Sequence, residues 1–274
     1  MPTSAIEVTE LNVYPVKSMR GTTLGRVRLT ATGLEWDRQW LVVDGKGTFL
    51  TQRTHPQLAR IVPEVRNGVL LLSAPGLAIL TVPLAFEGTP VPVRVWDDAC
   101  VGAEQGGDAH AWISRALGQS VRLVRIPPDF GRRANPKFAG DVPAPVTFTD
   151  GYPILVCNEA SLDDLNDRLP EPIPMNRFRP NIVLRGLPAW AEDQIDSIVI
   201  GAVTLRLVKP CTRCVIPSID QQTGQSSTDP TPALKKFRFS KDLRGVMFGE
   251  NAVIVSGAGE RIERGAPVEA RFEP

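Results

Sequence analysis

The sequence predicts a mainly β protein with few helices, built from two domains. Twenty-five prolines and 23 glycines interrupt short runs rich in valine, isoleucine and leucine, a pattern typical of strands joined by turns. Apolar residues recur at helical spacing in only two segments. A length of 274 residues exceeds one comfortable core. So many strands in two units predict barrels or sandwiches.

The expected strands are short runs with partial alternation or continuous apolar character. We expect them at residues 6–13, 25–29, 39–43, 68–72, 79–82, 91–96, 121–125, 153–156, 182–184, 198–200, 203–208, 214–219 and 252–255.

Two helices are expected where apolar residues recur every three or four positions behind a capping side chain. The first begins after Asp108 and ends before Gly118, with an apolar face formed by Ala109, Trp112, Ile113 and Ala116. The second begins after Asn158 or Ser161 and ends before Pro170, with an apolar face formed by Leu162, Leu165 and Leu169.

A domain boundary is expected in the segment 127–145. This segment is rich in proline, glycine and charge and has almost no apolar periodicity, which is typical of a loop or linker. The predicted domains are therefore residues 1–126 and 127–274.

The charge balance argues against polyanionic partners. Lysine plus arginine number 31 and aspartate plus glutamate 30, so no general field attracts nucleic acid or an anionic membrane. The N-terminus lacks a basic region and an apolar core, and no apolar run approaches the ~20 residues that span a bilayer. The four cysteines are too sparse for a disulfide scaffold in a chain of this length, which indicates a reducing compartment. We expect a cytoplasmic protein that binds neither nucleic acid nor membrane.

Cys211 and Cys214 form the one Cys-x-x-Cys pair of the chain. A structural zinc site would need two more ligands, and a thioredoxin-like dithiol normally opens a helix, whereas an apolar run and Pro217 follow here. Two buried structural thiols are a third alternative. Because Lys209 and Arg213 are cations beside the pair, they favour the thiolate, the form that binds metal or attacks an electrophile.

Two further segments carry groups suited to an anion. Residues 175–183 place Arg177, Arg179 and two asparagines before an apolar strand, and arginine binds phosphate bidentately. Lys17 and Ser18 lie on a turn after a strand. Ordinary surface ion pairs and a solvated turn are the alternatives. The signatures of P-loop, dinucleotide-binding and common hydrolase sites are absent.

Together these segments resemble the MOSC family, in which an N-terminal MOSC β-barrel domain precedes a MOSC domain, as in the mitochondrial amidoxime-reducing component and bacterial N-hydroxylate reductases. The resemblance extends from end to end of the chain. The segments that carry it are residues 14–18, 33–38, 51–53, 158–162, 177–183 and 210–214, with Asp220 and residues 223–224.

The resemblance implies two β-barrel-like domains with a molybdenum cofactor between them. Cys214 would be the catalytic residue and the protein's metal ligand, with the other sulfur ligands supplied by the pterin dithiolene. Lys17, Ser18 and Arg38 would reach the cofactor's phosphate, while the pterin would be lined by Arg179, Asn181, Thr212 and Arg213. Further expected contacts are Arg53, Thr149, Asp150 and Arg177.

The implied activity is an oxidoreductase that removes oxygen from small N-hydroxylated compounds such as amidoximes, hydroxylamines and hydroxylated base analogues. No cysteine set for an iron–sulfur cluster and no nicotinamide signature is found. Electrons are therefore expected from a separate ferredoxin-type or cytochrome-type protein and its reductase. The alternatives are a carrier of the cofactor or of its sulfur, and a cofactor-free protein.

Overall fold

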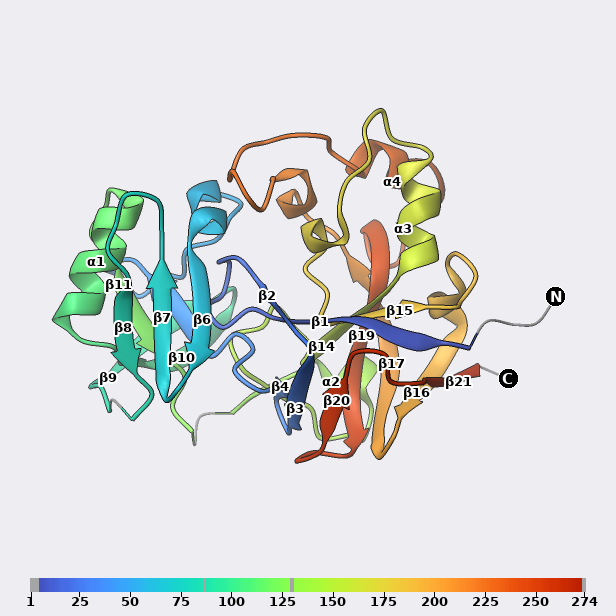
Figure 1. The fold of residues 1–274 in the computed structure, drawn as a ribbon, viewed down its shortest axis with the longest axis horizontal. Coiled ribbons are helices and arrows are strands. Elements are labelled where there is room, and N and C mark those ends of the chain that lie inside the picture. Colours follow the sequence, from blue (N-terminus) through green and yellow to red (C-terminus); the bar gives the residue numbers. More distant parts are fainter. Residues whose placement is uncertain (1–4, 86, 129–130, 273–274) are drawn as a thin grey trace.

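The computed structural model describes residues 5–85, 87–128 and 131–272. Strands dominate these ranges, so the mainly β prediction is confirmed (Figure 1). The α-helices are α1 (Gly107–Leu117), α2 (Pro136–Ala139), α3 (Glu159–Asn166) and α4 (Thr231–Phe237). The strands are β1 (Glu7–Val13), β2 (Thr22–Leu24), β3 (Arg26–Thr30), β4 (Gly33–Leu34), β5 (Trp40–Val43), β6 (Val62–Arg66), β7 (Val69–Ser73), β8 (Leu80–Pro83), β9 (Pro90–Val95), β10 (Asp98–Glu104), β11 (Arg122–Arg125), β12 (Arg132–Arg133), β13 (Pro145–Val146), β14 (Ile154–Asn158), β15 (Ile182–Arg185), β16 (Ile195–Ile200), β17 (Val203–Thr212), β18 (Phe239–Ser240), β19 (Gly245–Ser256), β20 (Arg261–Glu263) and β21 (Glu269–Phe272).

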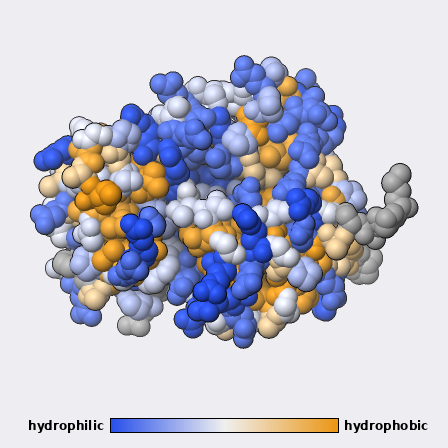
Figure 2. Space-filling view, in the orientation of Figure 1, coloured by the Kyte–Doolittle hydropathy of each residue, from blue (hydrophilic) through white to orange (hydrophobic). Residues whose placement is uncertain are grey.

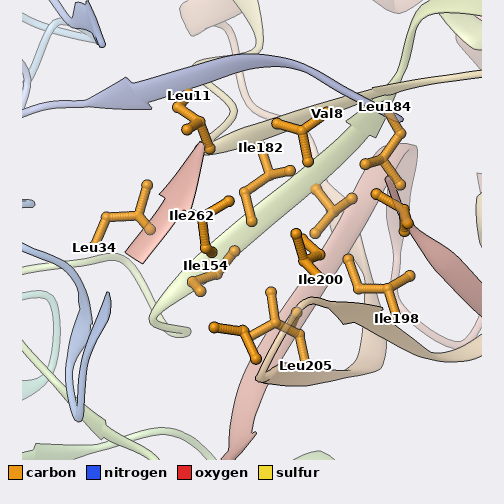
Figure 3. Packing of buried hydrophobic residues seen from close by; sticks show 14 of the residues in the cluster. Val8, Leu11, Leu34, Ile154, Ile182, Leu184, Ile198, Ile200, Leu205 and Ile262 are labelled. Carbon is orange, nitrogen blue, oxygen red and sulfur yellow. The ribbon is translucent and has the colours of Figure 1, made fainter. Parts of the chain in front are cut away.

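A nine-stranded sheet organises the lobe on the right of Figure 1. Its order is β2-β1-β15-β14-β19-β17-β16-β21, with β18 also paired to β19. All pairs are antiparallel except β14 with β15. One face buries an aliphatic core, drawn in Figure 3, to which Val8, Ile182, Leu205 and Ile262 contribute. Burying such side chains contributes about 1.5–3 kcal/mol each.

The other lobe contains the sheets β5-β11-β10-β9 and β6-β7-β8. Helix α1 contacts β11 and β8. Its buried side chains Ala109 and Ile113 join a core that includes Trp40, whose indole N–H donates to Gln105 at 3.0 Å. The buried ring is thus both packed and hydrogen-bonded.

The first strands of the chain pair with the C-terminal half. β1 is hydrogen-bonded to β15, and β3 is hydrogen-bonded to β20. Side chains of β1, β3 and β4 belong to the same core as β14–β20, including Leu11, Leu29 and Leu34. A domain boundary between residues 126 and 127 stays a prediction. Strands from before this boundary pair with strands from after it.

Twelve of the thirteen predicted strands are confirmed, most of them within a few residues, but β19 begins seven residues before the predicted 252–255 and β17 extends four residues beyond the predicted 203–208. The strand at 214–219 is wrong: a 3-10 turn at Ile216–Ser218 occupies it, with Pro217 in its first turn. The first helix begins at Gly107, with Asp108 in its first turn rather than before it. The second begins after Asn158, whose side chain caps it, and ends at Asn166. Segment 127–145 contains α2 and short strands as well as loop.

Within the described ranges, no helix is both long and apolar enough to cross a membrane.

The strand crossover predicts that residues 127–274 do not fold alone. Without β1 to β4 the apolar faces of Ile182 and Ile262 would be exposed, and buried side chains of Val8, Leu11 and Leu29 would be missing from the core. Urea unfolding followed by circular dichroism should show no cooperative transition for this fragment. Co-expression with residues 1–126 should restore the transition. A cooperative transition of the fragment by itself would contradict the shared core.

Candidate functional site

A cavity of about 290 Å³ lies where residues of the two halves of the chain meet. Its walls are formed by Lys17, Ser18, Arg38, Thr51, Arg53, Trp96, Thr149, Asp150, Gly151, Tyr152, Ile154, Leu155, Phe178, Arg179, Asn181, Lys209, Cys211, Thr212, Arg213, Cys214, Ile216 and Asn251. Because the lining comes from loops and strand ends far apart in sequence, the cavity depends on the packing of both lobes.

Positive charge dominates the lining. Six cations line the cavity against one carboxylate, that of Asp150, although the whole chain has a net charge of only +1. Like charges around one cavity repel each other, so this concentration needs a compensating anion. The six cations are Lys17, Arg38, Arg53, Arg179, Lys209 and Arg213.

Tyr14 holds two of these cations. The guanidinium carbons of Arg38 and Arg179 lie 4.1 and 4.3 Å from the centre of its ring, a cation–π arrangement that orients both groups. The Tyr14 hydroxyl donates to the carbonyl of Pro180 at 3.1 Å. Burial is the largest influence on Arg179 and lowers its pKa to about 10, so the guanidinium remains charged at neutral pH.

Asn181 ties the N-terminal strand to the cavity. Its side-chain amide donates to the carbonyl of Asn12 at 3.1 Å, and its side-chain oxygen accepts from the Leu155 backbone N–H at 3.1 Å and from Arg38 at 3.2 Å. Asn181 is 2% exposed. Its side chain therefore fixes β1, β14 and Arg38 relative to one another, besides lining the wall.

Strained backbone gathers at the same place. Eight described non-glycine residues have positive φ, and four of them line the cavity: Ser18 (66°), Arg38 (47°), Trp96 (55°) and Arg179 (58°). Such conformations cost of order 1–3 kcal/mol each and persist only where the surroundings impose them. Their concentration at one cavity makes it the candidate functional site.

An ion pair closes one side of the cavity. Lys17 Nζ lies 2.5 Å from Asp150 Oδ1 and donates to the Phe148 carbonyl at 2.8 Å. The Trp96 indole donates to the same Asp150 oxygen at 3.0 Å, and the Arg53 guanidinium lies 4.3 Å from the Trp96 ring. Burial lowers the pKa of Lys17, and Asp150 opposes this. The Asp150 side chain is 64% exposed, so burial raises its pKa little, and Lys17 and Trp96 hold that pKa below its ordinary value.

Several buried polar atoms of the lining have no partner within the described protein. They are the hydroxyls of Thr149 and Tyr152 and the Nε of Arg213. An unmet buried donor costs about 1–3 kcal/mol, and a polar ligand in the cavity would satisfy these atoms. Together with the cation excess, they make the cavity suited to a phosphate-bearing cofactor.

Cys214 lies two residues beyond the end of β17, just before the turn that replaces the predicted strand. Its sulfur accepts the backbone N–H of Ile216 at 3.5 Å. Arg213 donates to Cys211 Sγ at 2.9 Å and to the Phe178 carbonyl at 2.6 Å. Burial opposes the charge of Arg213, but the neighbouring cysteines, Cys211 first, raise its pKa overall. Arg213 therefore places a positive charge directly against the cysteine pair.

The geometry argues against three alternatives for the cysteine pair: buried structural thiols, a protein-only metal site and a thioredoxin-like dithiol. Both Cys211 and Cys214 are partly exposed and line the cavity, unlike buried structural thiols. Among the described residues, no group of three or more His, Cys, Asp or Glu side chains gathers as a protein-only metal site. A three-residue 3-10 turn follows Cys214 in place of the helix that a thioredoxin-like dithiol would open.

The turn after Cys214 is anchored from outside the cavity. Arg177 is 4% exposed and pairs with Asp220 at 3.0 Å, while Asp220 also accepts the backbone N–H groups of Gln222 and Thr223. Buried Gln52 bridges the lobes by donating to Ser18 O at 2.7 Å and exchanging hydrogen bonds with Gln221. Hydrophilic residues gather where this turn approaches the N-terminal lobe, at the top of Figure 2.

Eleven of the twelve predicted site residues line the cavity. Arg177 lies outside the lining and holds the Cys214 turn through Asp220. The residues that sequence reasoning missed include Trp96, Tyr152 and Gln221. The sequence predicts Trp96 as the last residue of a strand at 91–96, but β9 ends at Val95 and the indole lines the cavity from the turn that follows.

Comparison with known proteins gives two family matches. Residues 5–120 match the MOSC N-terminal beta barrel domain, and residues 143–269 match the MOSC domain. The chain is 34% identical over 253 residues to mitochondrial amidoxime-reducing component 1 of Mus musculus, covering 89% of this chain and 74% of that protein. The Homo sapiens protein of the same name is 34% identical over 255 residues, covering 89% and 75%.

A different relative shares only part of its length. Molybdenum cofactor sulfurase of Bos taurus is 32% identical over 260 residues, which cover 87% of this chain but 30% of the sulfurase.

The Lys17–Asp150 pair predicts a pH-dependent stability. Because the folded pKa of Asp150 lies below its ordinary value of 3.8, the pair stabilises the fold above about pH 4 and loses this contribution as the pH falls. In urea unfolding, the parent should exceed Asp150→Asn in free energy of unfolding near neutral pH, and this difference should shrink steadily as the pH falls below about 4. Asp196→Asn, an exposed control without an ion pair among the described residues, should track the parent. A pH-independent difference would contradict the pair.

Proposed function

The chain belongs to the family of two-domain MOSC proteins that includes the mitochondrial amidoxime-reducing components. We propose that it is a molybdenum-cofactor-dependent oxidoreductase that reduces N-hydroxylated compounds. The observation that carries the proposal is a partly exposed cysteine, Cys214, on the wall of a cavity with six cations and one carboxylate. A soft thiolate suits the metal, and the cations suit an anionic pterin phosphate.

The residues divide into two roles. Cys214 would ligate the metal, and Arg38, Arg179 and the Lys17–Ser18 turn would hold the phosphate and pterin. When bound, the cofactor would supply the redox centre that accepts the oxygen of the N-hydroxyl group. Asn181 orients the Arg38 guanidinium by accepting a hydrogen bond from it. The protein thus contributes binding, orientation and charge.

Tyr152 and Lys17 at the cavity wall could donate protons, whereas Asp150 could accept hydrogen bonds. The lowered pKa of Asp150 keeps its carboxylate ionised at neutral pH, so it accepts hydrogen bonds and does not act as an acid. Burial raises the pKa of Tyr152 to about 12, so its unpartnered hydroxyl stays protonated and can donate to a ligand. The Lys17 ammonium, held against Asp150 Oδ1, is a further proton-bearing group at the wall.

A second candidate is a carrier of the cofactor or of its sulfur, without turnover of its own. The similarity to a molybdenum cofactor sulfurase supports it, and Cys214 would then carry a persulfide. Turnover of an N-hydroxylated substrate by the purified protein with a reductant separates the two candidates, because a carrier does not turn over. The cytoplasmic location remains a prediction.

The proposal predicts different effects at the two cysteines. Cys214→Ser should lower turnover and molybdenum content at least about 100-fold, the upper end of the cost of losing an outer partner of a metal site, because a hydroxyl replaces a soft thiolate. Cys211→Ser is the matched control and should keep much of both, since its sulfur accepts from Arg213 and donates to the Thr212 carbonyl, contacts that a serine hydroxyl can also make. Metal analysis and an amidoxime-reduction assay measure both. Equal losses would favour a two-cysteine site.

Electron supply gives a further prediction. We expect no reduction of an amidoxime with NADH alone, because the sequence carries no common nicotinamide signature. A reduced viologen, or a ferredoxin-type or cytochrome-type protein with its reductase, should restore turnover. Turnover with only NADH, in protein shown to be free of contaminating reductase, would contradict a separate electron donor.

A further inference from the structure

Exposed positive charge gathers on one segment beside the cavity. Between residues 235 and 244, Lys235, Lys236, Lys241 and Arg244 are all exposed, against a single exposed acid, Asp242. The four cations form no salt bridge within the described parts of the chain. In a nearly neutral protein, such a cluster creates a local positive field. We call these four cations, with Phe237 and Phe239, the α4–β18 patch.

The α4–β18 patch also exposes large apolar side chains. Phe237 is 39% exposed and Phe239 is 47% exposed, and Val215, which directly follows Cys214, is 50% exposed. These make up three of the seven exposed large hydrophobic residues found in the described structure. Exposed aromatic groups rimmed by charge are typical of surfaces that contact another protein.

The patch is two strand spacings from the metal-ligating segment. Phe239 of β18 is paired with Val246 of β19, and the Val246 carbonyl accepts the backbone N–H of Arg213, next to Cys214. Neighbouring strands lie about 4.8 Å apart. The backbone of β18 is therefore roughly 10 Å from that of Arg213, which is short for a surface that must communicate with a buried centre.

A continuous series of packed rings also joins the patch to the cavity wall. Phe237 contacts Trp190 with ring centres 5.3 Å apart, Trp190 contacts Phe248 at 5.8 Å, and Phe248 stacks on Phe178 at 3.8 Å. Phe178 lines the cavity. Because no ring of this series is separated from the next by a void, the protein between the patch and the cavity is densely packed.

We propose that the α4–β18 patch is the docking surface for an acidic one-electron carrier protein. This inference rests on the proposed reductase function and names where its electrons enter. The positive charge complements an acidic partner and steers it, while the exposed phenylalanines supply a small apolar contact at the centre. Electron-transfer encounters bury little area and depend on such steering.

The test uses the full-length protein loaded with its cofactor and an acidic [2Fe–2S] ferredoxin with its NADPH-dependent reductase. The patch variant is Lys235→Glu with Lys236→Glu. The matched control is Arg28→Glu with Arg261→Glu, which reverses two exposed cations paired across β3 and β20. Figure 1 shows these strands at the bottom of the view and α4 at the top. Viologen-driven reduction is measured alongside, because a small dye needs no docking surface.

At low salt, the patch variant should lose at least about tenfold in kcat/KM for ferredoxin and much of its salt dependence. Its viologen-driven rate should equal the parent's, and the control should match the parent in both assays. Equal ferredoxin rates in patch and control variants would overturn the docking surface. An absence of viologen-driven turnover in the parent would instead overturn the reductase proposal.

Direct binding keeps the inference testable even without turnover. Ferredoxin should bind the parent and the control with equal affinity in titration calorimetry, and the patch variant more weakly. Vesicles of phosphatidylserine and phosphatidylcholine test the other class of anionic surface. If the patch residues govern binding to these vesicles and not to ferredoxin, the patch is a membrane contact and the inference is wrong.

Discussion

Electrostatic repulsion among the cations around one cavity must be balanced by the surrounding structure. Six positive side chains face one carboxylate, and their mutual repulsion opposes folding until an anion compensates it. The protein holds them in place by other means: Tyr14 lies between two guanidinium groups, Asp37 pairs with Arg38, and the strained backbone of Arg179 is fixed by its neighbours. This arrangement sacrifices stability for a preformed binding site.

The cavity exists only because the two halves of the chain are interlocked. β1 lies in the C-terminal sheet, and Asn181 joins it to the strand beside the cavity. Gln52 and Gln221 link the lobes near the turn that follows Cys214. The loops that carry the phosphate-binding candidates are thereby held at fixed positions relative to the cysteine, as precise cofactor binding requires.

Sequence patterns predicted what depends on local periodicity and residue chemistry, and little of what depends on tertiary contact. Most strands followed from short apolar runs, but residues 214–219 were expected as a strand because Val215 and Ile216 are β-branched, and Pro217 with the cavity contacts overrides that propensity. Arg177 and Arg179 share one motif, yet they point to Asp220 and to the cavity respectively, which spacing alone cannot distinguish. Trp96 reaches the cavity from a turn in which its backbone is left-handed. An aromatic residue gives no sequence signal for such a conformation.

We infer that the cationic cavity and Cys214 together hold a molybdenum cofactor. Molybdenum K-edge X-ray absorption on protein purified from cells that make the cofactor detects both the metal and its sulfur ligands. We expect molybdenum close to one per chain, with sulfur neighbours that include a cysteine thiolate in addition to the dithiolene. Protein that lacks molybdenum under these conditions, or that carries zinc at its cysteines instead, would show that this inference is wrong.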